Sequence, residues 1–278
     1  MNVTANYTVN CSILLTELPL LERPAAAKAA GFDAVEFWWP FGTSVPADAD
    51  VDAFESAIRD AGVQLTGLNF NGGDLPGGDR GLVSWPARSG EFRDNIDVVA
   101  AIGRDLGCPA FNALYGNRVE DGSVSAQQQD ELGIENLGIA AAALSSFGAT
   151  VLLEPVSGVD SYPLKTAADA LAVIENVRAA SGADNLKLLA DFYHLAVNGD
   201  DMPAVIEKHA HDFGHIQIAD NPGRGAPGTG SLPLTDWVAR SRELGYNGYV
   251  GLEYKSASAD AFDWLTTASE PQQRRINS

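Results

Sequence analysis

The chain has 278 residues, of which 45% are hydrophobic and 20% charged, so it has enough apolar material for a folded core and too little charge for a disordered polypeptide. Its 37 acidic and 18 basic residues give a formal net charge of −19. Such a surface repels the phosphates of nucleic acids and of anionic membranes, so we expect neither as a partner.

The first residues of the chain predict a cytoplasmic protein. They carry neither the basic segment nor the apolar segment of a secretion signal, and no apolar run approaches the length of a membrane span. Cys11 and Cys108 are too few and too far apart in sequence for a metal knuckle or a disulfide framework. We therefore expect two buried free thiols.

Short β-branched runs alternate along the chain with longer stretches of helical period, which indicates repeated βα units and a parallel sheet. In chain order the pattern predicts strand 3–9, helix 18–30, strand 34–38, helix 51–61, strand 64–69, helix 92–106, strand 110–114, helix 127–147, strand 150–154, helix 167–180, strand 187–191, helix 202–209, strand 214–218, helix 234–244 and strand 249–253.

The spacing of these units favours a closed architecture. A glycine follows most of the predicted helices, where a left-handed residue ends a helix: Gly31, Gly62, Gly107, Gly148, Gly182 and Gly245. Eight evenly spaced units without a Pro-, Gly- or Ser-rich linker fit a barrel better than an open doubly wound sheet. We predict a single (β/α)8 barrel domain over residues 1–278.

Four oxygen-bearing side chains stand at or near the ends of four consecutive predicted strands: Glu154, Asp191, Gln217 and Glu253. In a barrel the carboxyl ends of the strands share one face, where active sites lie. Three carboxylates crowded there repel one another unless a cation compensates, and with an amide oxygen they form a ligand set suited to Mg²⁺ or Mn²⁺. The pattern therefore predicts one divalent cation bound by these four residues.

Several segments resemble the hydroxypyruvate isomerase family, which belongs to the xylose-isomerase-like TIM barrels. The similarity extends over nearly the whole chain and is strongest in Leu153-Glu154-Pro155, Asp191-Phe192-Tyr193-His194, His215-Ile216-Gln217-Ile218-Ala219-Asp220-Asn221-Pro222 and Gly251-Leu252-Glu253-Tyr254-Lys255, with Val35-Glu36-Phe37 and Gly78-Asp79-Arg80-Gly81 earlier in the chain. The run around Gln217 is the most specific, because related 3-epimerase barrels usually carry His at that position.

The resemblance implies an isomerase that interconverts hydroxypyruvate and tartronate semialdehyde, with Glu154 and Glu253 as the acid and base. Such a reaction moves a proton between adjacent carbons through a cis-enediolate, which suits a carboxylate on each side of the substrate. Three further functions stay open: a 2-oxo-tetronate isomerase, a ketose 3-epimerase of the same superfamily, and a non-catalytic barrel that binds a sugar acid.

The expected partner is a small keto or hydroxy acid, whose carboxylate needs cationic or hydrogen-bonding side chains. Arg224, in the loop after the seventh strand, is the preferred candidate, since a guanidinium binds a carboxylate with two hydrogen bonds. Lys255 and Arg80 are further candidates, while His194 and His215 are expected to contact substrate oxygens or to orient a metal ligand. A homo-oligomer is compatible with the sequence.

Two sequence features qualify this interpretation. Leu68 and Ser231 depart from the family pattern, and strand three closes with Asn69-Phe70-Asn71-Gly72-Gly73, so we expect an altered pocket wall at the distal end of the substrate. Residues 223–228 match the GxGxxG dinucleotide motif, but the Pro and Gly residues that follow cannot begin the helix that such a motif requires. We therefore do not expect a nicotinamide cofactor.

Overall fold

The strands of the computed structural model, which describes residues 4, 6–256 and 261–267, form a closed parallel barrel in sequence order. β8 pairs with β1 to close the ring. The strands are β1 (Tyr7–Asn10), β2 (Ala34–Phe37), β3 (Gln64–Asn69), β4 (Ala110–Asn112), β5 (Thr150–Leu153), β6 (Leu186–Asp191), β7 (Phe213–Ile218) and β8 (Val250–Leu252). The predicted (β/α)8 barrel is confirmed, although the start of the predicted first strand lies partly outside the described residues.

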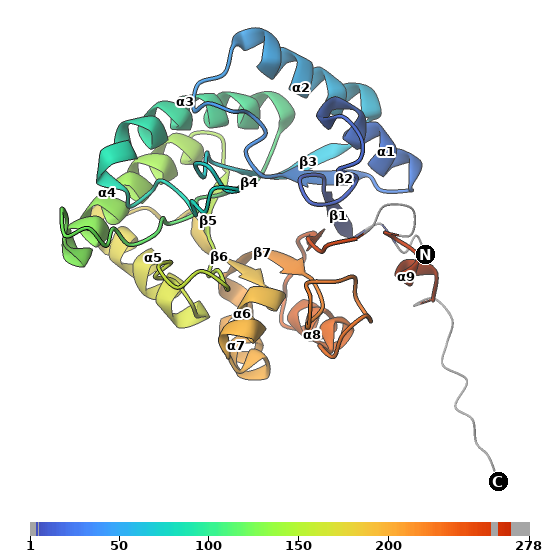
Figure 1. Ribbon diagram of the computed structural model, residues 1–278. Helices are drawn as coiled ribbons and strands as arrows, with labels where there is room; N and C mark the ends of the chain where they lie inside the picture. The colour runs from blue at the N-terminus through green and yellow to red at the C-terminus, as the bar shows by residue number, and fades with distance from the viewer. Residues whose placement is uncertain (1–3, 5, 257–260, 268–278) are drawn as a thin grey trace.

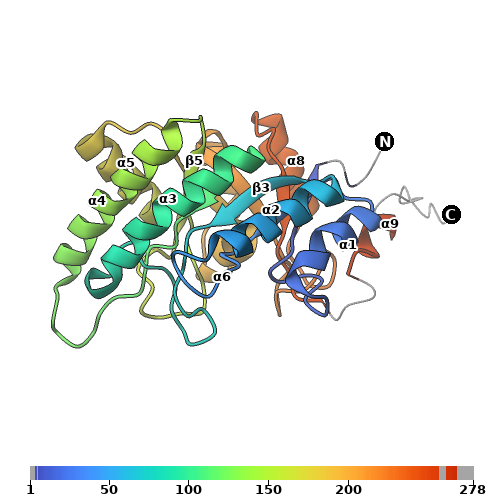
Figure 2. The ribbon, with the colours of Figure 1, turned by 90° about the horizontal axis from the view of Figure 1, so that it is seen from above.

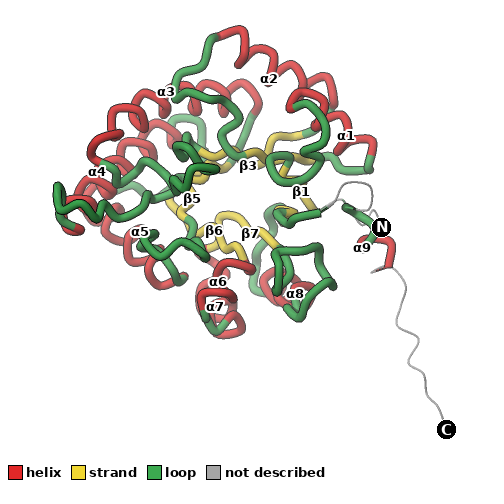
Figure 3. The backbone as a smooth tube through the Cα atoms, in the orientation of Figure 1, coloured by secondary structure: helices red, strands yellow, loops and turns green. Residues whose placement is uncertain are grey.

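Helices surround this ring of strands, as Figures 1 and 3 show. They are α1 (Arg23–Ala29), α2 (Asp48–Ala61), α3 (Ser89–Leu106), α4 (Ala126–Ser145), α5 (Ala167–Ser181), α6 (Phe192–Asn198), α7 (Met202–His209), α8 (Leu234–Glu243) and α9 (Trp264–Thr267). In Figure 2, α2, α3 and α4 run side by side along one flank of the barrel. Among the described residues, no helix has both the length and the apolar character needed to cross a bilayer.

Glycines in a left-handed conformation follow the helices, as the sequence predicts. All six glycines expected after helices adopt positive φ angles, from 65° at Gly62 to 102° at Gly245. Gly62 needs this freedom because its N–H returns to the Arg59 carbonyl of α2 in a left-handed conformation that a side chain would disfavour. At the other end of helices, Ser125 and Thr166 form capping boxes that begin α4 and α5.

Apolar side chains fill two separate regions. The large core lies between strands and helices, where Phe111 of β4 packs against Phe70 and Phe147. A small cluster of Ala110, Leu152 and Leu189 lies apart from it. Because successive strand residues alternate faces, Glu154 and Asp191, two residues beyond Leu152 and Leu189, point to the same side as this cluster, at the carboxyl ends of their strands.

Helix α6 was not predicted, because it begins directly at the end of β6 without an intervening loop. Asp191 ends the strand and also caps the helix, since its Oδ1 accepts the N–H of Tyr193 at 2.8 Å and of His194 at 3.2 Å. The short helix therefore fixes the direction of the Asp191 carboxylate and carries His194 next to it.

Candidate active site

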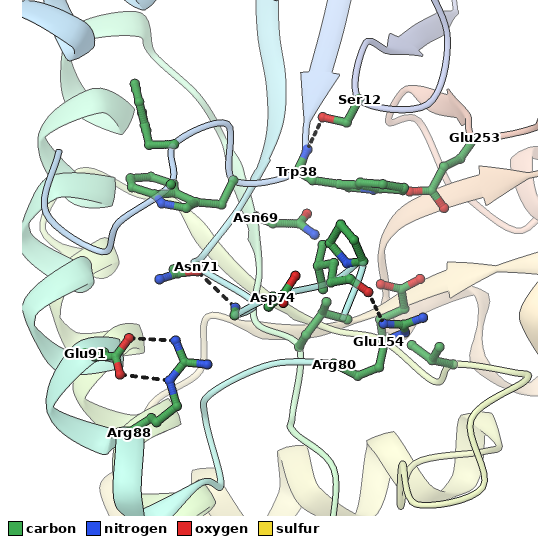
Figure 4. Close-up of a pocket in the computed structure, with 18 of the residues that line it drawn as sticks. Ser12, Trp38, Asn69, Asn71, Asp74, Arg80, Arg88, Glu91, Glu154 and Glu253 are labelled. Atoms are coloured by element: carbon green, nitrogen blue, oxygen red, sulfur yellow. Dashed lines mark hydrogen bonds and ion pairs between the residues drawn. The ribbon is translucent and has the colours of Figure 1, made fainter. Parts of the chain in front are cut away.

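A cavity of about 780 Å³ opens at the carboxyl ends of the strands. Glu154 and Glu253 line one end of it, while the ion pair of Arg88 and Glu91 lies at the opposite side (Figure 4). The remaining lining residues include Trp38, Trp39, Phe41, Asn69, Asn71, Leu75, Arg80, Leu114, Ser157, His194 and Arg224. Of the four predicted strand-end residues, Glu154 and Glu253 therefore line a cavity of a size typical of small-molecule sites, whereas Asp191 and Gln217 are buried outside its lining.

Glu154, Asp191, His194 and Glu253 form a buried group whose potential ligand atoms all lie within 4.8 Å of one another. Burial raises the pKa of Glu154 well above its ordinary value, and the nearby Glu253 and Asp191 carboxylates raise it further. Burial also raises the pKa of Asp191, and it raises that of Glu253 to about 7 against the opposing charge of Arg224. This crowding of buried carboxylates means that the group can hold a metal ion.

Arg224 supplies positive charge to this group in the structure. Its guanidinium Nη2 bonds Glu253 Oε2 and lies 3.5 Å from Asp191 Oδ2, while its Nε donates to the Glu253 carbonyl at 3.2 Å. The same guanidinium stacks over the Tyr193 ring, 5.6 Å from its centroid. Arg224 lines the cavity as predicted, but its charge is engaged by protein carboxylates.

The tautomer of His194 decides whether this residue can ligate a cation. Its Nδ1 accepts the backbone N–H of Ser157 at 3.1 Å, and burial lowers its pKa to about 3, so the ring is neutral at ordinary pH. A neutral imidazole that accepts at Nδ1 carries its proton on Nε2. The Nε2 atom, 3.6 Å from Asp191 Oδ2 and 3.9 Å from Glu154 Oε1, is therefore a hydrogen-bond donor rather than a metal ligand.

Gln217, unlike His194, has a side-chain atom that is free to ligate a cation. It pairs in register with Asp191 on β6 and with Gly251 on β8, so it stands between the strands that carry Asp191 and Glu253. Its Nε2 donates to Glu36 Oε1 at 2.8 Å, whereas its Oε1 is buried and has no hydrogen-bond partner among the described residues. An unpartnered buried oxygen on the residue that pairs with Asp191 fits a hard divalent cation.

Neutral donors hold the two glutamates in place. Asn112 Nδ2 donates to Glu154 Oε2 at 2.6 Å, and Trp38 Nε1 and Asn10 Nδ2 donate to Glu253 Oε1 at 2.7 and 2.9 Å. These bonds orient both carboxylates without adding charge.

The other predicted site residues separate into two groups. Arg80 lines the cavity and donates from Nη1 to the carbonyls of Leu75 and Asp79, at 2.9 and 2.6 Å. His215 is buried and lies outside the cavity lining, with Nε2 2.6 Å from Glu36 Oε2. Lys255 is exposed and also lies outside the lining. The structure thus brings Arg80 to the site but not His215 or Lys255.

The departures from the family pattern affect the cavity differently than expected. Leu68 belongs to the large apolar core and Ser231 is exposed, so neither forms part of the cavity wall. Asn69, Asn71 and Gly73 do line the cavity. Of the departures from the family pattern, only those at and just after the end of β3 therefore lie at the cavity wall.

Sequence reasoning missed Glu36, Asn10, Trp38 and Asn112 as parts of the site. Each lies at or next to the end of one of the first four strands, on β1, β2 and β4, and Glu36 is buried with only 3% exposure. A charged residue within the apolar run 34–38 is the signal that could have identified Glu36, because a buried carboxylate needs partners.

Comparison with known proteins agrees with this architecture. Residues 24–273 match the family model described as xylose isomerase-like TIM barrel. A putative hydroxypyruvate isomerase of Streptomyces coelicolor is 57% identical over 93% of this chain and 95% of its own length. The hydroxypyruvate isomerase of Escherichia coli is 32% identical over 90% and 93%, and a 2-oxo-tetronate isomerase of Cupriavidus necator is 31% identical over 93% and 96%.

Among solved structures, one from Brucella melitensis titled AP endonuclease, family 2 superposes with a TM-score of 0.83 at 29% identity, covering 95% of this chain and 98% of that one. Its fold is the same closed barrel, and the relatives cover this chain almost from end to end. The chain belongs to the xylose isomerase-like TIM barrels and, among them, to the hydroxypyruvate isomerase family, which is a family of isomerases.

Proposed function

We propose that the protein is a metal-dependent aldose–ketose isomerase of a short sugar acid, converting hydroxypyruvate to tartronate semialdehyde (2-hydroxy-3-oxopropanoate). The observation that carries this proposal is the pair Glu154 and Glu253, two buried carboxyl groups of raised pKa that line one end of a single cavity. Relatives named for this reaction support the choice of substrate.

The two glutamates act as the acid and the base. One carboxylate removes a proton from C3 of hydroxypyruvate, which gives an enediolate, and a proton is returned to C2 while the hydroxyl proton moves to the neighbouring oxygen. A carboxyl group with a pKa of about 7, as for Glu253, is suited to both accepting and giving a proton near neutral pH. His194 Nε2–H is available to donate a hydrogen bond to a substrate oxygen.

The proposed ligands of one Mg²⁺ or Mn²⁺ ion are Glu154, Asp191, Gln217 and Glu253. When bound, the cation supplies positive charge to the two substrate oxygens that become negative during the reaction. The unpartnered Oε1 of Gln217 and the proton on His194 Nε2 support this ligand set over one that includes the histidine.

We assign the substrate carboxylate to Arg80. Two backbone carbonyls hold its guanidinium, and within the described part of the chain no carboxylate lies within 4 Å of it. Arg224, in contrast, already pairs with Glu253 and Asp191. An uncompensated guanidinium at the cavity wall attracts an anion and can bind a carboxylate through two hydrogen bonds.

Arg80→Gln is therefore expected to lower kcat/KM for hydroxypyruvate by about 30-fold or more, mainly through KM, since losing one partner of a buried charge pair costs about 2–5 kcal/mol. Arg80→Lys keeps the charge but loses the planar guanidinium that can make two hydrogen bonds to a carboxylate. Its KM should lie between those of wild type and Arg80→Gln. Steady-state kinetics on the three proteins measure this effect. Arg93→Gln, which removes a guanidinium paired with Glu135 outside the cavity, is the control. Unchanged kinetics in Arg80→Gln would reassign the carboxylate to Arg224.

A four-carbon substrate is the second candidate. The cavity of about 780 Å³ is much larger than a three-carbon acid, and it continues past Asn71 toward Arg88 and Glu91. A 2-oxo-tetronate isomerase reaction would use the same two glutamates on a substrate one hydroxymethylene longer. A chelator-reversible isomerase assay on three- and four-carbon keto acids distinguishes the two substrates, and activity that survives complete metal removal would contradict both.

A ketose 3-epimerase and a non-catalytic barrel receive less support from the site. A 3-epimerase uses the same glutamate pair, but Gln217 stands where such barrels usually carry His. A non-catalytic barrel would have no need for two buried glutamates and an oriented His194 at one cavity. Adding ketoses to the assay on keto acids tests both functions, because a 3-epimerase would convert the ketoses and a binding barrel would convert nothing.

A further inference from the structure

Glu36 lies at the centre of a polar network beneath the proposed metal site. Its Oε2 lies 2.6 Å from His215 Nε2, and its Oε1 accepts from Gln217 Nε2 at 2.8 Å and from Asn10 Nδ2 at 3.2 Å. The same Asn10 nitrogen also donates to Glu253 Oε1. Glu36 therefore contacts Gln217 directly and Glu253 through Asn10, although it is not itself among the proposed ligands.

Two glycines make room for this arrangement. A Cβ at Gly251, on β8, would lie 2.6 Å from Glu36 Oε1 and 2.8 Å from Gln217 Cγ. A Cβ at Gly67, the register partner of Glu36 on β3, would lie 3.3 Å from Glu36 Cβ. Any larger residue at Gly251 would displace one of these side chains, so the interior of the barrel is shaped to seat Glu36 against Gln217.

The bond from Gln217 fixes which end of its amide is free. A carboxylate only accepts hydrogen bonds, so the atom of Gln217 that faces Glu36 must be the nitrogen. A planar amide carries its oxygen on the other side of the same carbon, and Gln217 Oε1 is accordingly turned away from Glu36. This oxygen is buried and has no partner within the described residues, which is costly unless a hydrogen-bond donor or a cation binds it.

We infer that Glu36 is a positioning residue that holds the Gln217 amide with its oxygen directed to the divalent cation. This inference rests on the proposed metal site. Without Glu36 the amide can turn over and present its nitrogen, which repels a cation. The inference explains why a glutamine, which has two chemically different ends, serves among ligands that are otherwise symmetric carboxylates.

Glu36→Gln tests this role directly, because an amide at position 36 can pair with either end of Gln217. We expect the variant to bind Mn²⁺ about 10–100-fold more weakly than wild type in isothermal titration calorimetry, the loss usual when a group that orients a metal ligand is removed. Glu55→Gln is the matched control: Glu55 is also buried, but it pairs with Arg59 on α2, away from the cavity. Its Mn²⁺ affinity should equal that of wild type.

The exchanged pair Glu36→Gln with Gln217→Glu separates orientation from a purely structural role. In that double variant the amide at position 36 donates to one oxygen of the carboxylate at position 217 and leaves the other free, so Mn²⁺ affinity should return to at least the wild-type value. If Glu36 served only through its contact with His215, the exchange would still lack that carboxylate and would not restore binding. A failure of the exchanged pair to recover, or an equal loss in Glu55→Gln, would overturn the inference.

A measurement on the wild-type protein covers the case in which Glu36→Gln does not fold. The side-chain NH₂ signal of Gln217, assigned in ¹⁵N NMR spectra by its absence from Gln217→Glu, should exchange slowly with solvent because one hydrogen is held by Glu36. Rapid exchange would overturn the inference. A wild-type protein that binds no Mn²⁺ would instead overturn the proposed metal site, whereas wild-type binding with an unaffected Glu36→Gln variant would overturn only the role of Glu36.

Discussion

Glu253→Gln and Glu154→Gln are each expected to lower kcat by about 10³-fold or more, with the fold retained. A glutamine has nearly the shape of the glutamate but neither accepts nor releases the proton, and proton transfer by a positioned group contributes about 10²–10⁴-fold to a rate. Loss of a proposed metal ligand adds to the effect. Single-turnover and steady-state rates on hydroxypyruvate, with circular dichroism to verify folding, measure the result.

The double variant gives a sharper test than either single change. Because the two glutamates act on one proton transfer, we expect the combined loss to be far smaller than the product of the two single losses. Glu55→Gln, an equally conservative change at a buried glutamate outside the cavity, should keep full activity. Near-wild-type rates in both Glu154→Gln and Glu253→Gln would rule out the assigned roles.

Removal of divalent cations is expected to abolish activity reversibly and to lower thermal stability, most strongly at high pH. At a metal concentration of about 100 times Kd the stabilisation is about 2.7 kcal/mol, which corresponds to a rise in Tm of about 5–10 °C for a domain of this size. Activity should return on adding Mg²⁺ or Mn²⁺ after chelation. Activity that persists in fully metal-free protein would contradict the proposal.

The pH dependence follows from the raised pKa values of Glu154, Asp191 and Glu253. A carboxyl group whose pKa rises from its ordinary value of 4.5 to about 7 on folding, as for Glu253, binds more protons in the folded state between these values. The metal-free protein should therefore lose stability as pH rises from about 4.5 to about 7. Metal requires the ionised carboxylates, so its stabilising effect should grow over the same window.

Thermal unfolding at pH 5 and pH 8, with and without Mn²⁺, measures both trends. The Mn²⁺-dependent rise in Tm should be clearly larger at pH 8. In Glu253→Gln the fall in metal-free stability across this window should be smaller, because one of the titrating groups is gone. An equal rise in Tm on adding Mn²⁺ at the two pH values would show that protons and the cation do not compete for these carboxylates.

The sequence was sufficient to predict the barrel and the strand-end carboxylates, since both follow from local patterns. Alternating strand and helix periods determine the order of elements, and the position of Glu154 two residues beyond Leu152 determines the side to which it points. These rules act within one element and need no knowledge of distant contacts.

Other features depend on contacts between distant segments and could not be read from local patterns. Strand alternation alone would put Phe213 on the same face as Gln217, but the register shifts between β6 and β7, and Phe213 packs against Phe192 in the large core. The sequence also does not show that the guanidinium of Arg224 is paired with Glu253 and Asp191, which is the contact on which the proposed assignment of the substrate carboxylate to Arg80 rests.

The position of Arg224 has a consequence for how the protein matures. Because its guanidinium already offsets the charge of Glu253 and Asp191, the barrel does not need a cation to bring these carboxylates together. For the proposed metal site, folding and metal binding are therefore separate steps, and the chain can complete its barrel before the cation binds.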